Sequence, residues 1–175
     1  SLAVAAFGRA INKNARVFGR DPSISVLGLT EDEHKQENRE LGLLAEREAK
    51  RRVNVIGAPF IEDRSMLFSH LARQHVCIMP SLHEGFGLVG WEAISAEIPL
   101  ILSKNSGLYE LLEYSLGGAG TGCVYGIDIH GSSGKTPYAD EDVDAVAEAL
   151  TEIQLNWEAA KKDAIACMLP HAGYI

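Results

Sequence analysis

The sequence predicts an α/β protein with a doubly wound parallel sheet of about six strands and helices on both faces, which is a Rossmann-like domain. Short apolar runs, several of them β-branched, alternate along the chain with longer helical patterns. A length of 175 residues suits one domain. The content of 46% hydrophobic and 23% charged residues is typical of a globular protein. We therefore expect residues 1–175 to form one domain.

Each expected element follows from one of these runs. The predicted strands are LAVAAF, SISVLGL, VNVIG, HVCIMP, PLILS and CVYGI, at residues 2–7, 23–29, 53–57, 75–80, 99–103 and 123–127. The predicted helices lie at about residues 12–18, 31–50, 62–73, 88–97, 106–115, 141–154 and 157–168. Because each strand is followed by a helix, the strands are expected to run parallel.

Local signals support two of the helix starts. Thr30 and Glu33 have the spacing of a capping box before the charge-rich segment 31–50. Asp140 can cap the helix that begins near residue 141. The polar segment DIHGSSGKTPYAD before it, rich in Gly and Ser, predicts an exposed loop.

Charge and cysteine usage exclude several classes of function. A formal charge of −8 argues against a broad nucleic-acid-binding or anionic-membrane surface. No segment has the apolar length of a membrane span, and no signal peptide is recognised. Cys77, Cys123 and Cys167 lack metal-ligand spacing and are interpreted as reduced thiols of a cytoplasmic protein. No metal site is expected.

The segment PSLHEGFGLVGWEA, residues 80–93, is the predicted functional site, because it follows a strand and enters a helix. Gly85 and Gly87 allow the backbone to approach a ligand, and a helix that begins near Leu88 offers N–H groups to a phosphate. Glu92 is an isolated carboxylate in an otherwise apolar run, and its burial is costly unless something pairs with it. One turn inside the helix, it can accept hydrogen bonds from a ribose diol, so we expect a nucleotide there.

Each feature of this segment also has a purely structural interpretation. Glu84 can simply favour the helix dipole, Glu92 can lie on an exposed stripe, and the GFG sequence can form a tight turn. Together the features favour the ligand-binding interpretation.

The segment PSLHEGFGLVGWEAISAEIPLILS resembles the signature of the group 1 glycosyltransferases (family 4), in which two Glu are separated by seven residues, here Glu84 and Glu92. FGRAINKN near the start is similar to the loop with Gly-Arg and Lys that follows the first strand in that family. The resemblance implies the C-terminal, nucleotide-sugar-binding half of a GT-B fold. The N-terminal acceptor domain would then lie outside this chain.

The resemblance also implies roles for individual residues. Glu84 would contact the donor sugar and Glu92 the ribose. The backbone around the helix start would line the sugar and the diphosphate through Gly85, Phe86, Gly87, Leu88 and Val89. Gly8 would belong to the first loop, and its cations Arg9 and Lys13 would stabilise the departing phosphate. Transfer would then need neither a metal nor a cofactor, and the family's retaining outcome is implied only by the resemblance.

Two positions depart from the family pattern, and a further segment is similar to a phosphate-binding loop without completing its motif. Glu97 occupies the position of a common Gly, and Gly90-Trp91 replaces an aliphatic pair. GSSGKT at residues 131–136 is similar to a P-loop, but Ile129 stands where the first Gly is required. Phe60 is a candidate for the base pocket, and Trp91 is expected to pack in the core.

We therefore interpret the chain as the donor domain of a cytoplasmic hexosyltransferase that uses a UDP-, GDP- or ADP-sugar and an unknown acceptor. Alone, the domain is expected to bind the donor without completing transfer. A noncatalytic nucleotide-sugar sensor and another GT-B enzyme, such as a sugar-nucleotide epimerase, remain alternatives.

Overall fold

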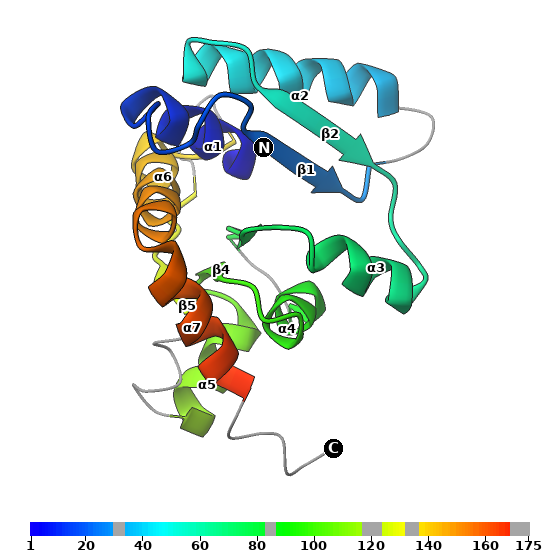
Figure 1. Ribbon diagram of the computed structural model, residues 1–175, viewed down its shortest axis with the longest axis vertical. Coiled ribbons are helices and arrows are strands. Elements are labelled where there is room, and N and C mark those ends of the chain that lie inside the picture. Colours follow the sequence, from blue (N-terminus) through cyan, green and yellow to red (C-terminus); the bar gives the residue numbers. More distant parts are fainter. Residues whose placement is uncertain (30–33, 83–86, 117–123, 132–136, 169–175) are drawn as a thin grey trace.

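The computed structural model describes residues 1–29, 34–82, 87–116, 124–131 and 137–168 (Figure 1). The expected capping box of Thr30 and Glu33 lies outside these residues, as do Glu84, Gly85 and Phe86. Helices and strands alternate in the order α1 (Leu2–Lys13), β1 (Ser23–Leu27), α2 (His34–Ala49), β2 (Asn54–Ala58), α3 (Arg64–Leu71), β3 (Cys77–Met79), α4 (Leu88–Ser95), β4 (Leu100–Ser103), α5 (Gly107–Leu116), β5 (Val124–Ile127), α6 (Asp140–Leu155) and α7 (Trp157–Met168).

The strands pair in parallel and form two separate sheets. β1 pairs with β2, and β3, β4 and β5 form a three-stranded sheet in that order. The α/β class and the parallel pairing are confirmed. The described residues hold five strands, one fewer than the sequence suggested.

The first expected strand is wrong, because residues 2–7 belong to helix α1. The helix expected at residues 12–18 is also wrong, since α1 ends at Lys13. Val4, Phe7 and Ile11 follow the helical period, and alanines fill most positions between them. α1 packs against both α2 and α6, so it is apolar on nearly all sides. The apolar run at residues 2–7 is too short by itself to show this period, so it does not separate a buried helix from a buried strand.

Two apolar clusters cover the opposite faces of the strands. One cluster joins α1, α2 and α6 through residues such as Val4, Ala45 and Val146. The other joins α3, α4 and α5 through residues such as Leu67, Ile94, Leu108 and Leu112. Neighbouring residues of β4 divide between the clusters, which is the pattern of a strand buried on both faces. α1 and α6 lie on one side of the strands in Figure 1, and α3 and α4 lie on the other.

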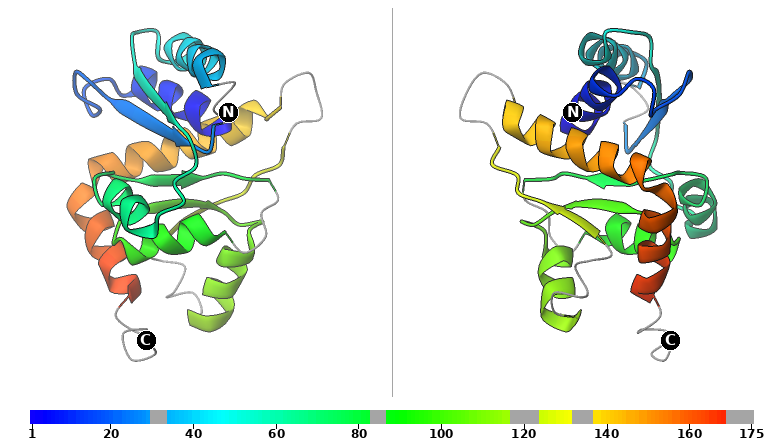
Figure 2. Two further views of the ribbon diagram at one scale, coloured as in Figure 1. Left: turned by 90° about the vertical axis from the view of Figure 1, so that its right-hand side faces the viewer. Right: turned by 60° about the vertical axis from the view of Figure 1, so that its left-hand side comes forward.

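The crossovers between successive strands change from one face of the strands to the other between β2 and β3. The crossover from β1 to β2 passes through α2 on the first face, whereas the crossovers from β3 to β4 and from β4 to β5 pass through α4 and α5 on the second face. α6 then returns to the first face, where it lies between α1 and the strands β4 and β5 (Figure 2). In doubly wound sheets the ligand site lies at the carboxyl ends of the strands on either side of the point where the crossovers change face.

No helix among the described residues is long and apolar enough to cross a membrane.

Candidate functional site

The start of α4 has the geometry of an anion site. Gly87, the N-cap residue, has φ 77° and ψ 53°, a left-handed conformation that favours glycine. The N–H groups of Gly90 and Trp91 donate to the Gly87 carbonyl at 3.0 and 3.2 Å. The N–H groups of Leu88 and Val89 precede the first intrahelical donors, and within the described part of the chain no acceptor binds them, so they can donate to a ligand.

Glu92 lies one turn inside α4 and faces the same cavity as Gly87, Leu88 and Val89. Its side chain is only 14% exposed. The nearest cation among the described residues is Arg64, with 3.9 Å between Nη2 and the Glu92 Oε1. This separation exceeds hydrogen-bond length, and no hydrogen bond to the Glu92 carboxylate occurs among the described residues. The carboxylate therefore retains its capacity to accept hydrogen bonds from a ligand.

Arg64 is a site residue that the sequence analysis missed. It is the first residue of α3, and its N-cap Asp63 accepts a hydrogen bond of 2.8 Å from the Met66 N–H. This cap fixes the start of α3, whereas the Arg64 side chain is 78% exposed and can adjust to a ligand. The signal in the sequence was Asp63 at the start of a predicted helix, but only the fold places the Arg64 side chain opposite Glu92.

The cavity has a volume of about 1550 Å³ and is lined along β1 and β3; we call the part of it at the carboxyl ends of these two strands the mouth. Gly28, Phe60, Arg64 and Glu92 are among the residues at this mouth. Phe60 is 70% exposed there, so its ring is open to a ligand. Trp91 packs against the cluster of α3, α4 and α5, in agreement with the expected core position.

Gly8, Arg9 and Lys13 are not part of this mouth. The expectation that they form a loop after a strand is wrong, because all three lie within α1. A Cβ on Gly8 would lie 2.6 Å from the Ala45 carbonyl oxygen, so Gly8 permits close packing of α1 on α2. None of the three residues lines the large cavity.

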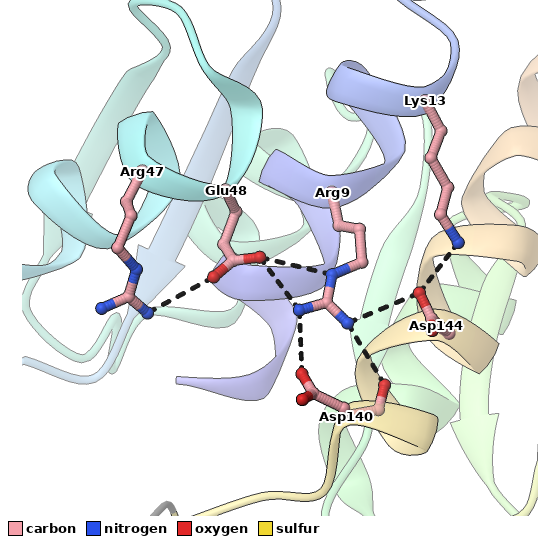
Figure 3. Close-up of polar contacts among 6 residues, drawn as sticks. All are labelled: Arg9, Lys13, Arg47, Glu48, Asp140 and Asp144. Carbon is pink, nitrogen blue, oxygen red and sulfur yellow. Dashed lines mark hydrogen bonds and ion pairs between the residues drawn. The ribbon is translucent and has the colours of Figure 1, made fainter.

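Arg9 and Lys13 instead form ion pairs between helices (Figure 3). Arg9 Nη2 lies 3.0 Å from both Glu48 Oε2 and Asp140 Oδ1, and Lys13 Nζ lies 2.8 Å from Asp144 Oδ1. Burial alone would lower the pKa of Arg9, but the hydrogen bonds to Asp140 and Glu48 raise it. In this structure both cations therefore pair with carboxylates of neighbouring helices, Arg9 with α2 and α6 and Lys13 with α6.

Asp142 organises the loop that follows β5. It is fully buried and accepts N–H groups from His130 at 3.0 Å and from Gly131 at 2.9 Å. Burial would raise the pKa of Asp142, but the hydrogen bonds from His130 and Gly131 outweigh it and lower the pKa. The carboxylate therefore stays charged and fixes the loop at the start of α6. The expected cap Asp140 lies at the first position of α6, and its carboxylate binds Arg9.

Comparison with known families identifies the chain. The family described as "Family 4 Glycosyltransferase in conflict systems" matches residues 1–168. The chain belongs to this family. The resemblance found in the signature around Glu84 and Glu92 is thereby confirmed, and glycosyl transfer is the chemistry of the family.

Solved structures with the same fold agree with this assignment. The chain is similar to an α,α-trehalose 6-phosphate synthase from Burkholderia multivorans, with a TM-score of 0.62 and 16% identity over 95% of this chain and 35% of that one. It is also similar to a UDP-forming α,α-trehalose-phosphate synthase from Burkholderia xenovorans in complex with glucose-6-phosphate, with a TM-score of 0.58 and 19% identity over 95% and 36% of the two chains. The family 4 chain thus spans about a third of each synthase and has the fold of one half of a GT-B enzyme. A search of curated proteins finds no match.

Proposed function

We propose that this domain binds the nucleotide-sugar donor of a family 4 glycosyltransferase. One observation carries the proposal: the glycine-capped start of α4 and the carboxylate of Glu92 open into the same cavity at the carboxyl ends of the strands. The amides offer hydrogen bonds to an anion, and the carboxylate one turn away offers acceptors to hydroxyl groups. A nucleoside diphosphate carries both kinds of group at about this separation.

The bound donor would be arranged along α4. The diphosphate would accept hydrogen bonds from the Leu88 and Val89 amides, and Glu92 would accept from the ribose hydroxyls. Arg64, beside Glu92, would supply positive charge at the mouth. The residues proposed for the sugar, Glu84, Gly85 and Phe86, lie outside the described part of the chain.

The remaining features of the reaction follow from the family resemblance and are proposals. The donor would be a UDP-, GDP- or ADP-linked hexose, and transfer would retain the anomeric configuration without a metal. The acceptor would bind to an N-terminal GT-B domain of the same cytoplasmic protein. The 175-residue chain alone would then bind donor without transferring it.

Calorimetric titration with UDP-, GDP- and ADP-sugars tests the proposal. One class should bind, and Glu92→Gln should weaken it by roughly 10- to 100-fold, since a charged acceptor is lost. Glu148→Gln, on the exposed face of α6, is the matched control and should leave the affinity unchanged. Addition of EDTA should have no effect. Equal affinities for the wild type and Glu92→Gln would contradict the ribose contact.

A pair of glycine variants tests the anion site separately. Gly87 and Gly19 both have left-handed backbones, with φ 77° and 68°, so alanine should cost each about 1 kcal/mol of stability. Only Gly87→Ala should weaken donor binding, because Gly19 lies in the segment between α1 and β1. A Gly87→Ala variant that binds donor like the wild type would exclude the start of α4 as the diphosphate site.

Assays of donor hydrolysis and transfer by the complete polypeptide distinguish an enzyme from a noncatalytic sensor. Slow hydrolysis of the bound donor by the complete polypeptide would support a transferase. Donor binding without hydrolysis or transfer would favour the noncatalytic alternative.

A further inference from the structure

Arg64 is the cation at the mouth of the cavity. Among the described residues that line the cavity, only Arg64 and Arg73 have an Arg or Lys side chain. Arg73 follows the end of α3 and precedes β3, so it lies toward the amino ends of the strands. Arg64 is the first residue of α3 and lies at the opposite, ligand-facing end. A ligand at the mouth therefore meets the guanidinium of Arg64.

The guanidinium of Arg64 has hydrogen-bonding capacity that the described part of the protein does not use. Its ion pair with Glu92 has a separation of 3.9 Å, and no hydrogen bond from the guanidinium occurs among the described residues. The Arg64 side chain is 78% exposed, and an exposed ion pair of this kind contributes little to stability. The N–H donors of Arg64 are therefore available to a ligand.

The place of Arg64 beside Glu92 decides which part of a nucleotide it meets. The N–H groups of Leu88 and Val89 lie at the start of α4, and Glu92 lies one turn further on, about 6 Å along the helix axis. Arg64 pairs with the Glu92 end of this stretch. The inference rests on the proposed function, in which the amides hold the diphosphate and Glu92 holds the ribose. The guanidinium then lies beside the ribose, and the base is the group that the ribose carries there.

Phe60 provides an aromatic ring at the same mouth. It belongs to the segment between β2 and α3, which also leads into Arg64. Phe60 lines the cavity and is 70% exposed, so its ring is open to contact. Stacking on an aromatic ring tolerates any base, because every base has a π-face. Phe60 can thus hold a base without selecting it, and selection requires a directional polar group.

A guanidinium is such a group, because it donates hydrogen bonds and accepts none. Guanine presents two neighbouring acceptors, O6 and N7, and uracil presents carbonyl oxygens. Adenine has an amino donor beside its N7 acceptor. A guanidinium that approaches the exocyclic group therefore finds an acceptor on guanine or uracil but another donor on adenine.

We propose that Arg64 selects the base of the donor nucleotide and favours uracil or guanine, which present carbonyl oxygens, over adenine. The carbonyl oxygen of the base accepts hydrogen bonds from the Arg64 guanidinium, while Phe60 stacks on the base and Glu92 holds the ribose. Arg64 acts on specificity and has no part in the bond that breaks during transfer.

Calorimetric titration with UDP, GDP and ADP tests this proposal, because these probes carry the diphosphate, ribose and base without the sugar. UDP or GDP should bind at least roughly tenfold more tightly than ADP. Arg64→Met keeps a long side chain without its donors and should reduce this preference to less than about threefold. Arg73→Met, at an exposed position of the other end of the cavity, is the matched control and should keep the wild-type preference.

Arg64→Lys separates the geometry of the guanidinium from its charge. Lysine keeps the charge but lacks the planar fork, so this variant should lose most of the preference and keep the mean affinity within about threefold. Equal weakening of UDP, GDP and ADP binding in Arg64→Met would indicate a phosphate contact and would overturn the proposal. A wild-type preference in Arg64→Met would overturn it as well.

Failure of the proposed function gives a different result. Absence of binding by all three nucleotides would overturn both proposals. Binding that depends on Glu92 but does not differ among UDP, GDP and ADP would overturn the role of Arg64 alone.

Discussion

The guanidinium of Arg9 on α1 holds the carboxylate of Glu48 on α2 through two hydrogen bonds, with Nε and Nη2 at 3.3 and 3.0 Å from Oε2. The same guanidinium reaches Asp140 and Asp144 of α6. One side chain thereby links three helices on one face of the domain (Figure 3). We conclude that this cation stabilises the fold.

Arg9→Ala should reduce the free energy of unfolding by about 1–3 kcal/mol, because it leaves Glu48 without its main partner. Urea denaturation measures this loss, and calorimetry should show unchanged donor affinity. The exposed Arg16→Ala is the control and should change stability by less than about 0.5 kcal/mol. Loss of donor binding by a folded Arg9→Ala protein would restore the catalytic role expected from the sequence.

Gly8→Ala and Gly42→Ala should have opposite effects on stability. A Cβ at Gly8 meets the Ala45 carbonyl oxygen at 2.6 Å, so alanine there should destabilise the protein by about 1–3 kcal/mol. A Cβ at Gly42, in α2, has no atom within 4 Å, so alanine should stabilise by about 0.5–1 kcal/mol through helix propensity. Thermal or urea unfolding compares the two. Stabilisation by both would show that α1 and α2 are not in close contact.

Glu97→Gly should stabilise the protein by about 1 kcal/mol. Glu97 has φ 59°, a left-handed conformation in which a side chain is strained. It ends α4 in a Schellman motif, with Glu97 N–H on the Ile94 carbonyl and Ile98 N–H on the Ala93 carbonyl. Glu97→Ala retains the strain, so a gain of equal size in that variant would contradict the explanation. Urea denaturation of the three proteins measures the difference.

The stability of the protein should fall in acid, and Asp142 should account for part of the fall. The lowered pKa of Asp142 means that its carboxylate is more stable in the folded protein than in the unfolded chain. This contribution is complete above the unfolded value of about 4 and is lost as the pH falls through the lowered pKa. Asp144, whose pKa is lowered mainly by its hydrogen bond from Lys13, acts in the same direction.

Asp142→Asn tests this origin of the acid sensitivity. The variant should lose about 1–3 kcal/mol at pH 7 and should show a smaller further loss between pH 5 and 3 than the wild type. Urea denaturation across this pH range provides the measurement. Asp163→Asn, at an exposed position of α7, should follow the wild-type profile. An unchanged profile in Asp142→Asn would assign the acid sensitivity to other carboxylates.

The chain from Ser23 onward was predictable because its strands and helices have distinct local patterns. SISVL, NVIGA and LILS are short, largely β-branched or apolar runs, and each is separated from the next by a longer helical segment. Leu2–Lys13 was not predicted, because the apolar run LAVAAF alone is too short to separate a helix from a strand, and the helical period of Val4, Phe7 and Ile11 extends beyond it. The motif around Arg9 therefore suggested a loop, whereas the structure has a helix at these residues.

The sequence by itself determined the α/β class, the family signature and the helix start at Leu88, because each depends on residues that are neighbours along the chain. Only the tertiary structure placed Arg64 beside Glu92, and only it placed Arg9 among carboxylates of α2 and α6. It also showed that β1 and β3 line one cavity. Such relationships depend on how helices and strands cross and pack, and local sequence carries no record of partners that are distant in the chain.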